Sequence, residues 1–369
     1  MAKYKLGDIC EIVSGSTPKT GIDEYWDGNI KWITPAEIDD DTYIITDSVR
    51  KITEMAVKKT GLSSFPKGTV VLSSRAPIGK VAIAGCEMYC NQGFKNLICS
   101  EKINNKYLYW FLKCNTVFLN SLGRGATFKE ISKRIVSEIE INVPDKEKQE
   151  EAVRTLEKTS EIIALRKQKL AALDTLIKAR FVELFGDPAS NPNKWPETTI
   201  GEECFYIKDG PHKSLSDIGK ENGGHPFISV RNIVNHEIDF STARYISDED
   251  YENAIKKCHP EKGDMLYSKG GTTGIAKLID VDVEFANWVH VAVLKFHKDK
   301  LNGLFFENML NSDYCYDQSQ RLTKGIANRD LVLSAMAQIK MYRPPMNLQI
   351  QFADFVKQVN KSKFINQLL

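Results

Sequence analysis

Apolar residues recur at every seventh position along the stretch from Asp145 to Phe185. The regularly spaced positions are Leu156, Ile163, Leu170, Ile177 and Leu184, with Leu173 at one intermediate position. Charged residues of both signs occupy many of the other positions, no glycine or proline interrupts the stretch, and Pro144 and Gly186 flank it. This pattern predicts one helix of roughly 40 residues, about 60 Å long, with an apolar seam that packs against another helix.

Short apolar runs before and after this helix predict two globular parts of mixed α/β structure. In the first part, approximately residues 3–143, strand-like runs cover 28–33, 69–73, 81–84 and 135–143, and 107–119 is predicted to be helical. In the second part, approximately residues 195–342, the strand-like runs are 226–230, 264–268 and 288–296, with a helix near 304–311. Turn-forming clusters separate the runs, as is typical of short strands. A last helix is predicted to begin near Met346, with apolar positions at Leu348, Phe352, Val356, Val359 and Leu368.

The two globular parts repeat one another in sequence. Gly68, Ser73 and Gly79 have counterparts 195 residues later, at Gly263, Ser268 and Gly274, and Pro144 and Gln149 are matched 200 residues later by Pro344 and Gln349. Because the matches keep one order along the chain, they predict a tandem duplication. The predicted domains are 1–144 and 187–345. The helices that follow them are 145–186 and 346–369, of which the second is the shorter.

Two seamed helices that each follow an equivalent domain predict how the halves meet. If the seams pack in antiparallel orientation, a pseudo-two-fold axis relates the two globular parts. The predicted fold class is therefore α+β, a mixed α/β fold with an internal repeat and an antiparallel coiled coil. Proteins with two reading heads at a fixed separation recognise separated half-sites on DNA. Since the two copies differ in sequence, we expect an asymmetric, bipartite site.

Several short motifs resemble the specificity (S) subunits of type I restriction-modification systems. They are Lys5-Leu6-Gly7-Asp8-Ile9, Gly15-Ser16-Thr17-Pro18, Ile30-Lys31-Trp32-Ile33, Gly68-Thr69-Val70-Val71-Leu72, Gly125-Ala126-Thr127 and the helix start from Pro144 to Gln149. The resemblance covers essentially the whole chain, and the motifs are specific as a set. It implies two target recognition domains that each read one half of a split site on double-stranded DNA. It also implies helices that set the spacer and dock two methyltransferase (modification) subunits.

The same resemblance implies the remaining partners and the cofactors. The methyltransferase subunits methylate adenine with S-adenosylmethionine, and added restriction motor-nuclease subunits use ATP and Mg²⁺. No cofactor is therefore expected in this chain, and no membrane partner is expected. The short last helix departs from the family pattern, and three interpretations of it are open: a weaker coiled coil, an altered partner surface, or a natural truncation.

The composition excludes several other classes of protein. With 369 residues, 42% of them hydrophobic and 27% charged, the chain can bury two cores and is not disordered. No apolar run is long enough to cross a membrane, and the N-terminal residues lack the apolar core of a signal peptide, so we expect a cytoplasmic location. The net charge of +2 indicates that basic residues for DNA binding are local. The eight cysteines form no CxxC pair and are expected to be reduced thiols rather than metal ligands.

The sequence contains none of the catalytic motifs expected of a methyltransferase or an ATPase. Residues 343–346, RPPM, lack the acid or amide and the aromatic residue of the N/D-P-P-Y/F motif. No GxxxxGK[S/T] phosphate loop occurs. Asp145, Glu147 and Lys148 have the wrong spacing for a nuclease signature and open the long helix. These observations predict a non-catalytic subunit.

We expect polar side chains on loops to read DNA, because bidentate groups match base edges and lysines neutralise phosphates. In the first domain the candidates are Ser74, Arg75, Lys80, Arg124, Thr127, Lys129, Lys133 and Arg134. In the second domain they are Lys213, Arg231, Lys269, Thr272, Thr273, Lys277, Arg321, Lys324, Asn328 and Arg329. The candidates for helix pairing are Leu156, Ile163, Leu170, Leu173, Ile177, Leu184, Phe352, Val356 and Val359. Both domains carry basic residues at equivalent loops, which favours these positions over ordinary surface charges.

Two other functions are compatible with the same residues. A stand-alone tandem-domain DNA-binding regulator would bind its operator without partners, and a gel-shift series with and without the methyltransferase separates it from an S subunit. A duplicated α/β enzyme acting on a small molecule is disfavoured because the sequence shows no paired acid and base motifs.

Overall fold

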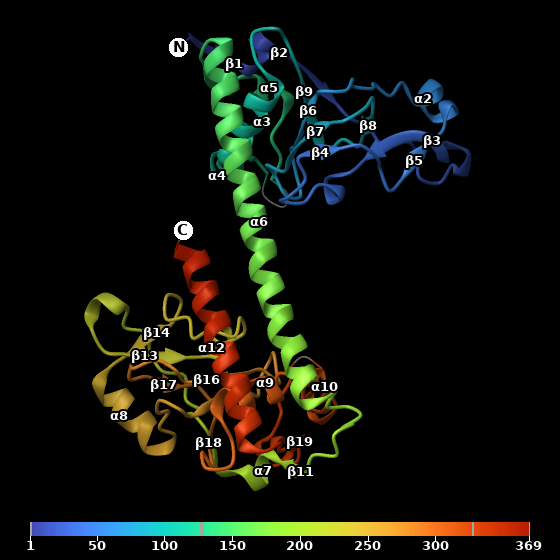
Figure 1. The fold of residues 1–369 in the computed structure, drawn as a ribbon. Helices are drawn as coiled ribbons and strands as arrows, with labels where there is room; N and C mark the ends of the chain where they lie inside the picture. The colour runs from blue at the N-terminus through green and yellow to red at the C-terminus, as the bar shows by residue number, and fades with distance from the viewer. Residues whose placement is uncertain (1, 126–128, 327, 369) are drawn as a thin grey trace. The chain divides into compact units, whose positions relative to one another are not determined.

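The computed structural model describes residues 2–125, 129–326 and 328–368 of the chain (Figure 1). The chain divides into two compact units, residues 1–165 and 166–369. Each unit has its own buried apolar clusters. The long helix α6 (Lys146–Phe185) contributes its first half to unit 1 and its second half to unit 2.

Unit 1 is built on a five-stranded sheet with the strand order β2-β9-β6-β7-β4. Its strands are β2 (Cys10–Ser14), β4 (Ile44–Ile45), β6 (Val70–Ser73), β7 (Val81–Ala84) and β9 (Phe94–Cys99). A second sheet has the order β5-β3-β8, and β1 pairs with β10. These strands are β1 (Ala2–Lys5), β3 (Trp26–Ile33), β5 (Lys51–Ile52), β8 (Tyr89–Cys90) and β10 (Glu140–Val143). Every residue of β6 and β7 is buried, because successive side chains of a central strand enter cores on both faces of the sheet.

Unit 2 repeats this topology among its described residues except for the edge strand β4, which has no counterpart in the four-stranded main sheet. Its sheets have the orders β12-β18-β15-β16, β14-β13-β17 and β11-β19. The strands are β11 (Glu197–Thr199), β12 (Cys204–Asp209), β13 (His225–Ile228), β14 (Arg244–Ile246), β15 (Met265–Ser268), β16 (Ala276–Leu278), β17 (Ala286–Asn287), β18 (Val291–Phe296) and β19 (Lys340–Tyr342). In both units the second sheet contains one parallel pair, β3 with β8 and β13 with β17. The matching strand orders and pairing directions confirm the predicted duplication.

Helices cover the sheets at equivalent places in both units. Unit 1 contains α1 (Leu6–Ile9), α2 (Glu54–Thr60), α3 (Asn105–Cys114), α4 (Thr116–Ser121), α5 (Lys133–Ser137) and the 3₁₀ turns η1 (Asp23–Tyr25) and η2 (Pro35–Glu37). Unit 2 contains α7 (Ile200–Glu203), α8 (Asp248–Lys257), α9 (Gly303–Leu310), α10 (Asp313–Leu322), α11 (Leu333–Met336), α12 (Met346–Leu368), η3 (Lys220–Asn222) and η4 (Val230–Asn232). The turns η2 and η4 follow β3 and β13 and are both closed by a capping box, which satisfies the free amides at their starts.

One buried glutamine in each unit fastens the helix that follows the domain. The Oε1 atom of Gln149 accepts a hydrogen bond from the amide of Asn104 at 2.8 Å, and its Nε2 donates to the carbonyls of Lys102 at 3.2 Å and Pro144 at 2.9 Å. Gln349 makes the same three bonds, to Asn302 at 2.8 Å, Lys300 at 3.1 Å and Pro344 at 2.7 Å. The duplication therefore extends from the sheets to individual buried hydrogen bonds.

Three predicted elements differ clearly from the observed ones in extent or continuity. The start of the predicted strand 135–143 is instead α5, because Ser132 caps a helical turn by accepting a hydrogen bond from the amide of Ile135 at 3.3 Å. The predicted helix 107–119 is divided into α3 and α4 at Asn115, whose side chain bonds the carbonyl of Phe111 at 2.7 Å. The predicted strand 288–296 begins only at Val291, since a turn joins the amide of Val291 to the carbonyl of Trp288 at 2.9 Å.

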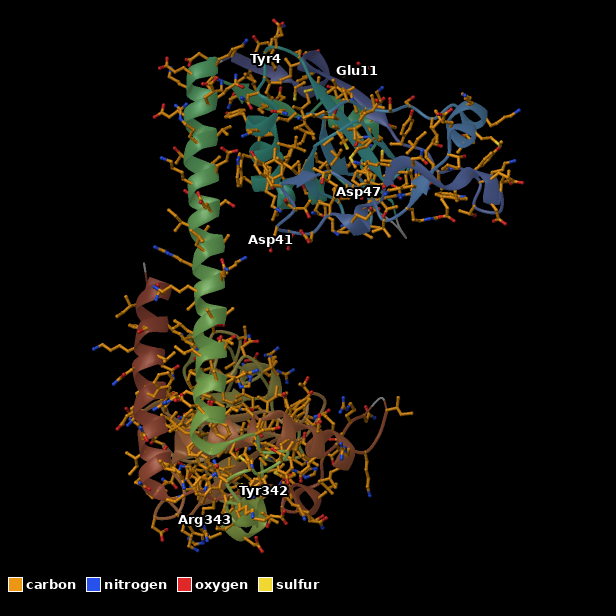
Figure 2. All side chains as sticks on the ribbon, turned by 45° about the vertical axis from the view of Figure 1, so that its right-hand side comes forward. Tyr4, Glu11, Asp41, Asp47, Tyr342 and Arg343 are labelled. Atoms are coloured by element: carbon orange, nitrogen blue, oxygen red, sulfur yellow. The ribbon has the colours of Figure 1, made fainter. Side chains whose placement is uncertain are left out.

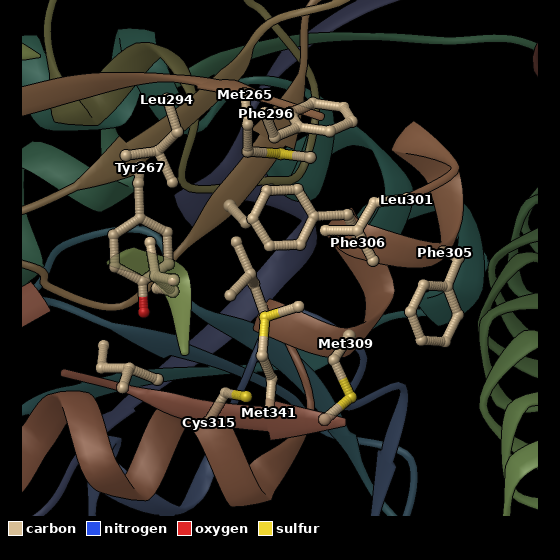
Figure 3. Close-up of a cluster of buried hydrophobic side chains, with 14 of the residues drawn as sticks. Met265, Tyr267, Leu294, Phe296, Leu301, Phe305, Phe306, Met309, Cys315 and Met341 are labelled. Carbon is tan, nitrogen blue, oxygen red and sulfur yellow. The ribbon is translucent and has the colours of Figure 1, made fainter. Parts of the chain in front are cut away.

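The helix predicted from the seven-residue pattern is confirmed as one continuous helix, α6. Within unit 2 its second half packs against α12 in antiparallel orientation, because Asp174 pairs with Lys363 while Phe181 lies 5.4 Å from Phe352. These aromatic side chains join the core formed by β15, β18 and α9, which Figure 3 shows around Met309. The last turn of α6 is therefore part of the hydrophobic core of unit 2.

The predicted seam positions differ in their burial. Ile177, Phe352, Val356 and Val359 are buried, Leu173 and Leu184 pack against the same core, and Leu156 and Leu170 are partly buried. Ile163, by contrast, is 49% exposed. The side chains of α6 are drawn as sticks in Figure 2. Phe181 and Phe185, which the pattern missed, are buried and stand four residues apart on one helix face.

In addition to Gln149, the residues Val153 and Glu157 attach the first half of α6 to unit 1. Val153 is buried against the domain. The carboxylate of Glu157 accepts hydrogen bonds from the Tyr43 hydroxyl at 2.7 Å and from Lys106 Nζ at 2.8 Å. Partial burial raises the pKa of Glu157, but the hydrogen bonds from Lys106 and Tyr43 outweigh it and hold the pKa below its usual value.

The described residues contain no helix that is both long enough and apolar enough to cross a membrane. They also contain no cluster of three or more His, Cys, Asp or Glu side chains suited to a metal ion. All eight cysteines are free thiols, and Cys10, Cys90, Cys204, Cys258 and Cys315 are buried.

Candidate nucleic-acid interface

Two loops meet at one place in each domain. In unit 1 the loop after β6 and the residues Arg124 and Glu130 are joined by antiparallel β-bridges of Glu130 with Arg75 and with Arg124, and the amide of Ile131 donates to the carbonyl of Ser74 at 3.0 Å. In unit 2, Asp330 makes the equivalent bridges with Gly270 and Lys324. The structure thus brings together the two groups of candidate residues that the sequence placed far apart in each domain.

A serine and a glycine determine the conformation of the loop after β6 in unit 1 and of the equivalent loop after β15 in unit 2. Ser73 accepts a hydrogen bond from the amide of Lys80 at 2.8 Å, and Ser268 accepts one from the amide of Ile275 at 2.9 Å. Gly79 and Gly274 precede these amides with φ of +96° and +91°, a region that side chains strongly disfavour. The serine and the glycine together fold each loop back on its strand, so they explain two of the matches that revealed the repeat.

A buried lysine holds Glu130 in unit 1 and the equivalent Asp330 in unit 2. In unit 1, Lys95 Nζ lies 3.2 Å from the Glu130 carboxylate and 3.2 Å from Ser74 Oγ. In unit 2, Lys269 Nζ lies 2.8 Å from Asp330 and 3.6 Å from Asp209. The lysine side chains are only 8% and 6% exposed, so each charge needs its acidic partner.

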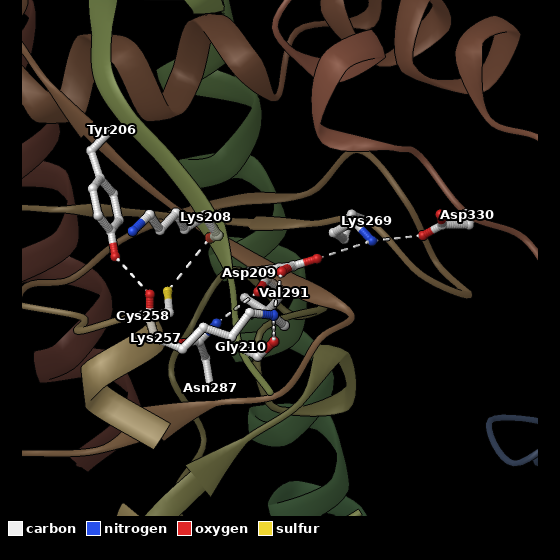
Figure 4. Close-up of polar contacts among 10 residues, drawn as sticks. All are labelled: Tyr206, Lys208, Asp209, Gly210, Lys257, Cys258, Lys269, Asn287, Val291 and Asp330. Carbon is white, nitrogen blue, oxygen red and sulfur yellow. Dashed lines mark hydrogen bonds and ion pairs between the residues drawn. The ribbon is translucent and has the colours of Figure 1, made fainter. Parts of the chain in front are cut away.

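The lysine of unit 2 belongs to a longer chain of charges, drawn in Figure 4. Asp209 at the end of β12 also accepts a hydrogen bond from Lys257 Nζ at 2.8 Å. The same Lys257 donates to the carbonyl of Gly210. Two lysines and two acids therefore alternate beneath the loops of unit 2 and fix their positions.

An open cleft of about 750 Å³ lies beside the paired loops of unit 1. Arg75 and Lys129 line it together with Glu130, and its remaining walls include Pro35 of η2 and the amide side chain of Asn120. The cleft combines two basic groups, an amide and apolar surface. These are groups that hydrogen-bond to base edges, neutralise phosphates and pack against sugars and methyl groups.

The candidate residues fall into three groups by exposure. Those with exposed side chains are Arg124, Lys129, Lys133, Arg134, Lys213, Arg231, Thr272, Arg321, Lys324 and Asn328. Arg75, Lys80 and Arg329 are partly buried, and Ser74, Lys269, Thr273 and Lys277 are buried. Thr127 lies outside the described residues.

Several candidates already have partners within the protein. Lys80 donates to the carbonyl of Pro35 at 2.9 Å, and Arg231 donates to that of Thr242 at 2.7 Å. Arg329 donates to the side chain of Gln320. Such contacts leave fewer donors for a nucleic acid.

Lys277, expected at the DNA surface, is instead held inside unit 2 by acidic side chains. Its Nζ lies 3.1 Å from Asp280 and 3.6 Å from Glu307. Burial raises the pKa of Glu307, and the lysine opposes that shift. Lys277 and Lys269 are therefore structural lysines, because the ammonium group of each is buried and paired with carboxylates of its own domain.

Sequence reasoning missed Lys95, Glu130, Asp330 and His290, which all lie at the paired loops. The acids could have been found from the repeat, since Glu130 and Asp330 are 200 residues apart. Lys95 and His290 lie on or beside strands that come between the two loops in the sequence. The repeat gave no signal for them, because the lysine of one domain has no lysine counterpart in the other.

Comparisons with known proteins agree on one family. The profile of the family described as "Type I restriction modification DNA specificity domain" matches residues 1–175 and 192–369. The type I restriction enzyme MjaIX specificity subunit of Methanocaldococcus jannaschii is 32% identical over 308 residues, which are 79% of this chain and 71% of that protein. The MjaVIII specificity subunit of the same organism is 22% identical over 374 residues, covering 96% of this chain and 85% of that protein.

Solved structures agree in fold. The crystal structure of the type I restriction-modification S subunit from M. genitalium has a TM-score of 0.59 at 15% identity, covering 99% of this chain and 91% of that chain. A structure described as showing complex assembly and conformational transition of the type I R-M system has a TM-score of 0.55 at 16% identity, with coverages of 99% and 91%.

Proposed function

This chain belongs to the type I restriction-modification DNA specificity family, and from that premise we propose that each domain reads one half of a bipartite site on double-stranded DNA. Members of this family are non-catalytic DNA-recognition subunits of a larger assembly. We assign reading to residues 1–144 and 187–345, and connection and docking to the helices 145–186 and 346–369.

The duplicated pair of loops carries this proposal. Both domains keep the serine and the glycine of the loop and hold the acid with a buried lysine, although that lysine comes from β9 in unit 1 and from the residue after β15 in unit 2. The side chains around this arrangement differ. Arg75, Arg124 and Lys129 surround the arrangement in unit 1, and Thr272 and Lys324 do so in unit 2. Two domains that recognise different base sequences need the same backbone arrangement with different exposed side chains, because the edges of different bases carry different donors and acceptors.

The helices are the proposed contact with the other subunits. Residues 158–165 of α6 are exposed and include Ile162, Ile163 and Leu165, each about half exposed. We assign this segment to the docking of two methyltransferase subunits, to which restriction motor-nuclease subunits add. S-adenosylmethionine, ATP and Mg²⁺ then act in those partners. The cytoplasm, with association with the nucleoid when DNA is bound, is the proposed location.

The test of DNA reading uses the full chain expressed with its methyltransferase subunits, with modified adenines mapped across the genome. Arg124→Ala combined with Arg134→Ala should degrade or relax one half-site and leave the other defined, because well-separated contacts contribute additively. Arg321→Ala with Lys324→Ala should affect the opposite half-site. Lys58→Ala, at an exposed lysine on α2, is the control. Equal loss of definition in both half-sites would contradict the division of labour.

A second experiment tests the helices. Asparagine at Ile163 and Leu170 should disturb assembly with the methyltransferase and alter the preferred spacer, while each half-site keeps its sequence. Size-exclusion chromatography of the co-expressed subunits measures assembly, and the methylation map gives the spacer. If the double variant assembles normally with an unchanged spacer, the helices do not measure the distance. Tight, specific binding by the isolated chain would instead favour a stand-alone regulator.

A further inference from the structure

At one pair of equivalent positions beside the paired loops, the large and the small residue are interchanged between the two domains. The amide of Ser74 donates to the carbonyl of Gly93 at 2.7 Å, and the amide of Lys269 donates to the carbonyl of His290 at 2.8 Å. Ser74 and Lys269 are themselves 195 residues apart, directly after the matched serines. Gly93 and His290 are therefore structural counterparts, and so are the next loop residues, Arg75 and Gly270.

The pairing of sizes is reciprocal. In unit 1 the loop carries Arg75, and the facing residue, just before β9, is a glycine, Gly93. In unit 2 the loop carries Gly270 and the facing residue is His290. A Cβ atom built on Gly270 would lie 2.0 Å from Nδ1 of His290, so the imidazole occupies the space in which a loop side chain would begin. One side chain is thus present at this place in each domain, and it comes from a different segment of the chain.

The Arg75 side chain stands beside the acid that the buried lysine holds, and the His290 side chain stands beside the loop residue that pairs with the equivalent acid. Arg75 Nη1 is 4.0 Å from Glu130, its side chain is 34% exposed, and it lines the cleft of unit 1. His290 lies beside Gly270, the residue that bridges Asp330.

The imidazole is held in position by several contacts. Its ring meets Trp288 edge-on, with centroids 4.7 Å apart. The carbonyl of His290 accepts hydrogen bonds from the amides of both Lys269 and Gly270. Its Nδ1 atom is buried and has no hydrogen-bond partner among the described residues. The ring is therefore fixed by packing and backbone contacts rather than by a polar partner of its own.

We propose that Arg75 and His290 are the corresponding specificity-determining residues of the two domains, each reading one base of its own half-site. This inference rests on the proposed function. It identifies, at equivalent places in the two domains, the residue whose side-chain chemistry differs. A guanidinium offers a fork of donors that fits the two acceptors of guanine in the major groove. An imidazole has two ring nitrogens and makes a single in-plane contact to a base edge. The domain with Arg75 therefore specifies guanine at this position, and the domain with His290 specifies its base through one hydrogen bond.

The experiment compares methylation maps made with the full chain and its methyltransferase subunits. Arg75→Ala should relax one position of one half-site, lowering discrimination against the wrong base by roughly five- to a hundredfold. His290→Ala should relax one position of the other half-site. His259→Ala, at an exposed histidine of the same domain, should leave both half-sites unchanged.

A second variant displaces the imidazole without altering its chemistry. Gly270→Ala introduces a Cβ where the ring now lies, so the ring must move. We expect this variant to relax the same base position as His290→Ala, with the rest of that half-site intact. Thermal unfolding of both variants identifies general loss of folding, which would degrade the whole half-site rather than one position.

The outcomes separate this inference from the proposed function. If Arg124→Ala with Arg134→Ala changes one half-site while His290→Ala and Gly270→Ala change none, DNA reading by the domains stands and His290 is not a reader. If His290→Ala relaxes the half-site read by Arg75, the assignment of counterparts is wrong. If the unaltered complex methylates without sequence preference, the proposed function itself fails.

Discussion

Replacing Gln349 by methionine would remove three hydrogen bonds from the buried junction between α12 and its domain. The glutamine is completely buried, and its partners are the amide of Asn302 and the carbonyls of Lys300 and Pro344. Methionine has a similar length and fills the space, so the main effect is three buried groups without partners. Each such group costs about 1–3 kcal/mol. Taking the lower end for each, the expected loss is about 3 kcal/mol.

Native-state hydrogen exchange measures this loss where it occurs. A loss of about 3 kcal/mol corresponds to exchange faster by on the order of a hundredfold for amides that exchange through opening of this junction. The effect should cover the start of α9, capped by Asn302, and the first turns of α12. Amides of unit 1 should keep their rates. Gln358→Met, at an exposed position of α12, is the matched control.

Because the domain is duplicated, the same substitution can be made at the equivalent glutamine of unit 1. Gln149 makes the same three bonds and is 1% exposed, so Gln149→Met should cost a similar amount in unit 1. The reasoning would be refuted if either variant lost less than about 1 kcal/mol, because the unpaired groups would then not carry the cost assigned to them.

Three further changes test other parts of the structure. Phe352→Ala should destabilise unit 2 by about 3–5 kcal/mol, because a buried ring between two helices leaves a cavity; urea unfolding measures this. Glu157→Gln should lose stability at neutral pH and progressively less as the pH falls below about 4, because a lowered carboxyl pKa stabilises the fold only while the group is ionised; unfolding measured from pH 3 to 7 checks the sign. Gly210→Ala should destabilise its domain, since the new Cβ would lie 1.7 Å from the carbonyl oxygen of Asn287, whereas Gly21→Ala meets nothing within 4 Å and should fold normally in a thermal melt.

The sequence by itself determined the features that depend on local order. The seven-residue spacing predicted α6, because side chains seven apart lie on one face of a helix whatever surrounds it. The ordered matches at intervals of 195 and 200 residues predicted the duplication, and β6, β7 and β15 lie within one residue of the predicted strands. Basic residues on two loops of each domain were also identified in advance.

Only the tertiary structure decided which of those residues are available. Lys269 and Lys277 look like surface charges in the sequence, but Asp209, Asp330 and Glu307, which are distant from them along the chain, hold them inside the domain. Ile163 continues the seam and is nevertheless half exposed, since burial depends on whether another element reaches that turn. The place shared by Arg75 and His290 arises where segments about 20 residues apart pack together, and periodicity along the chain does not record such contacts.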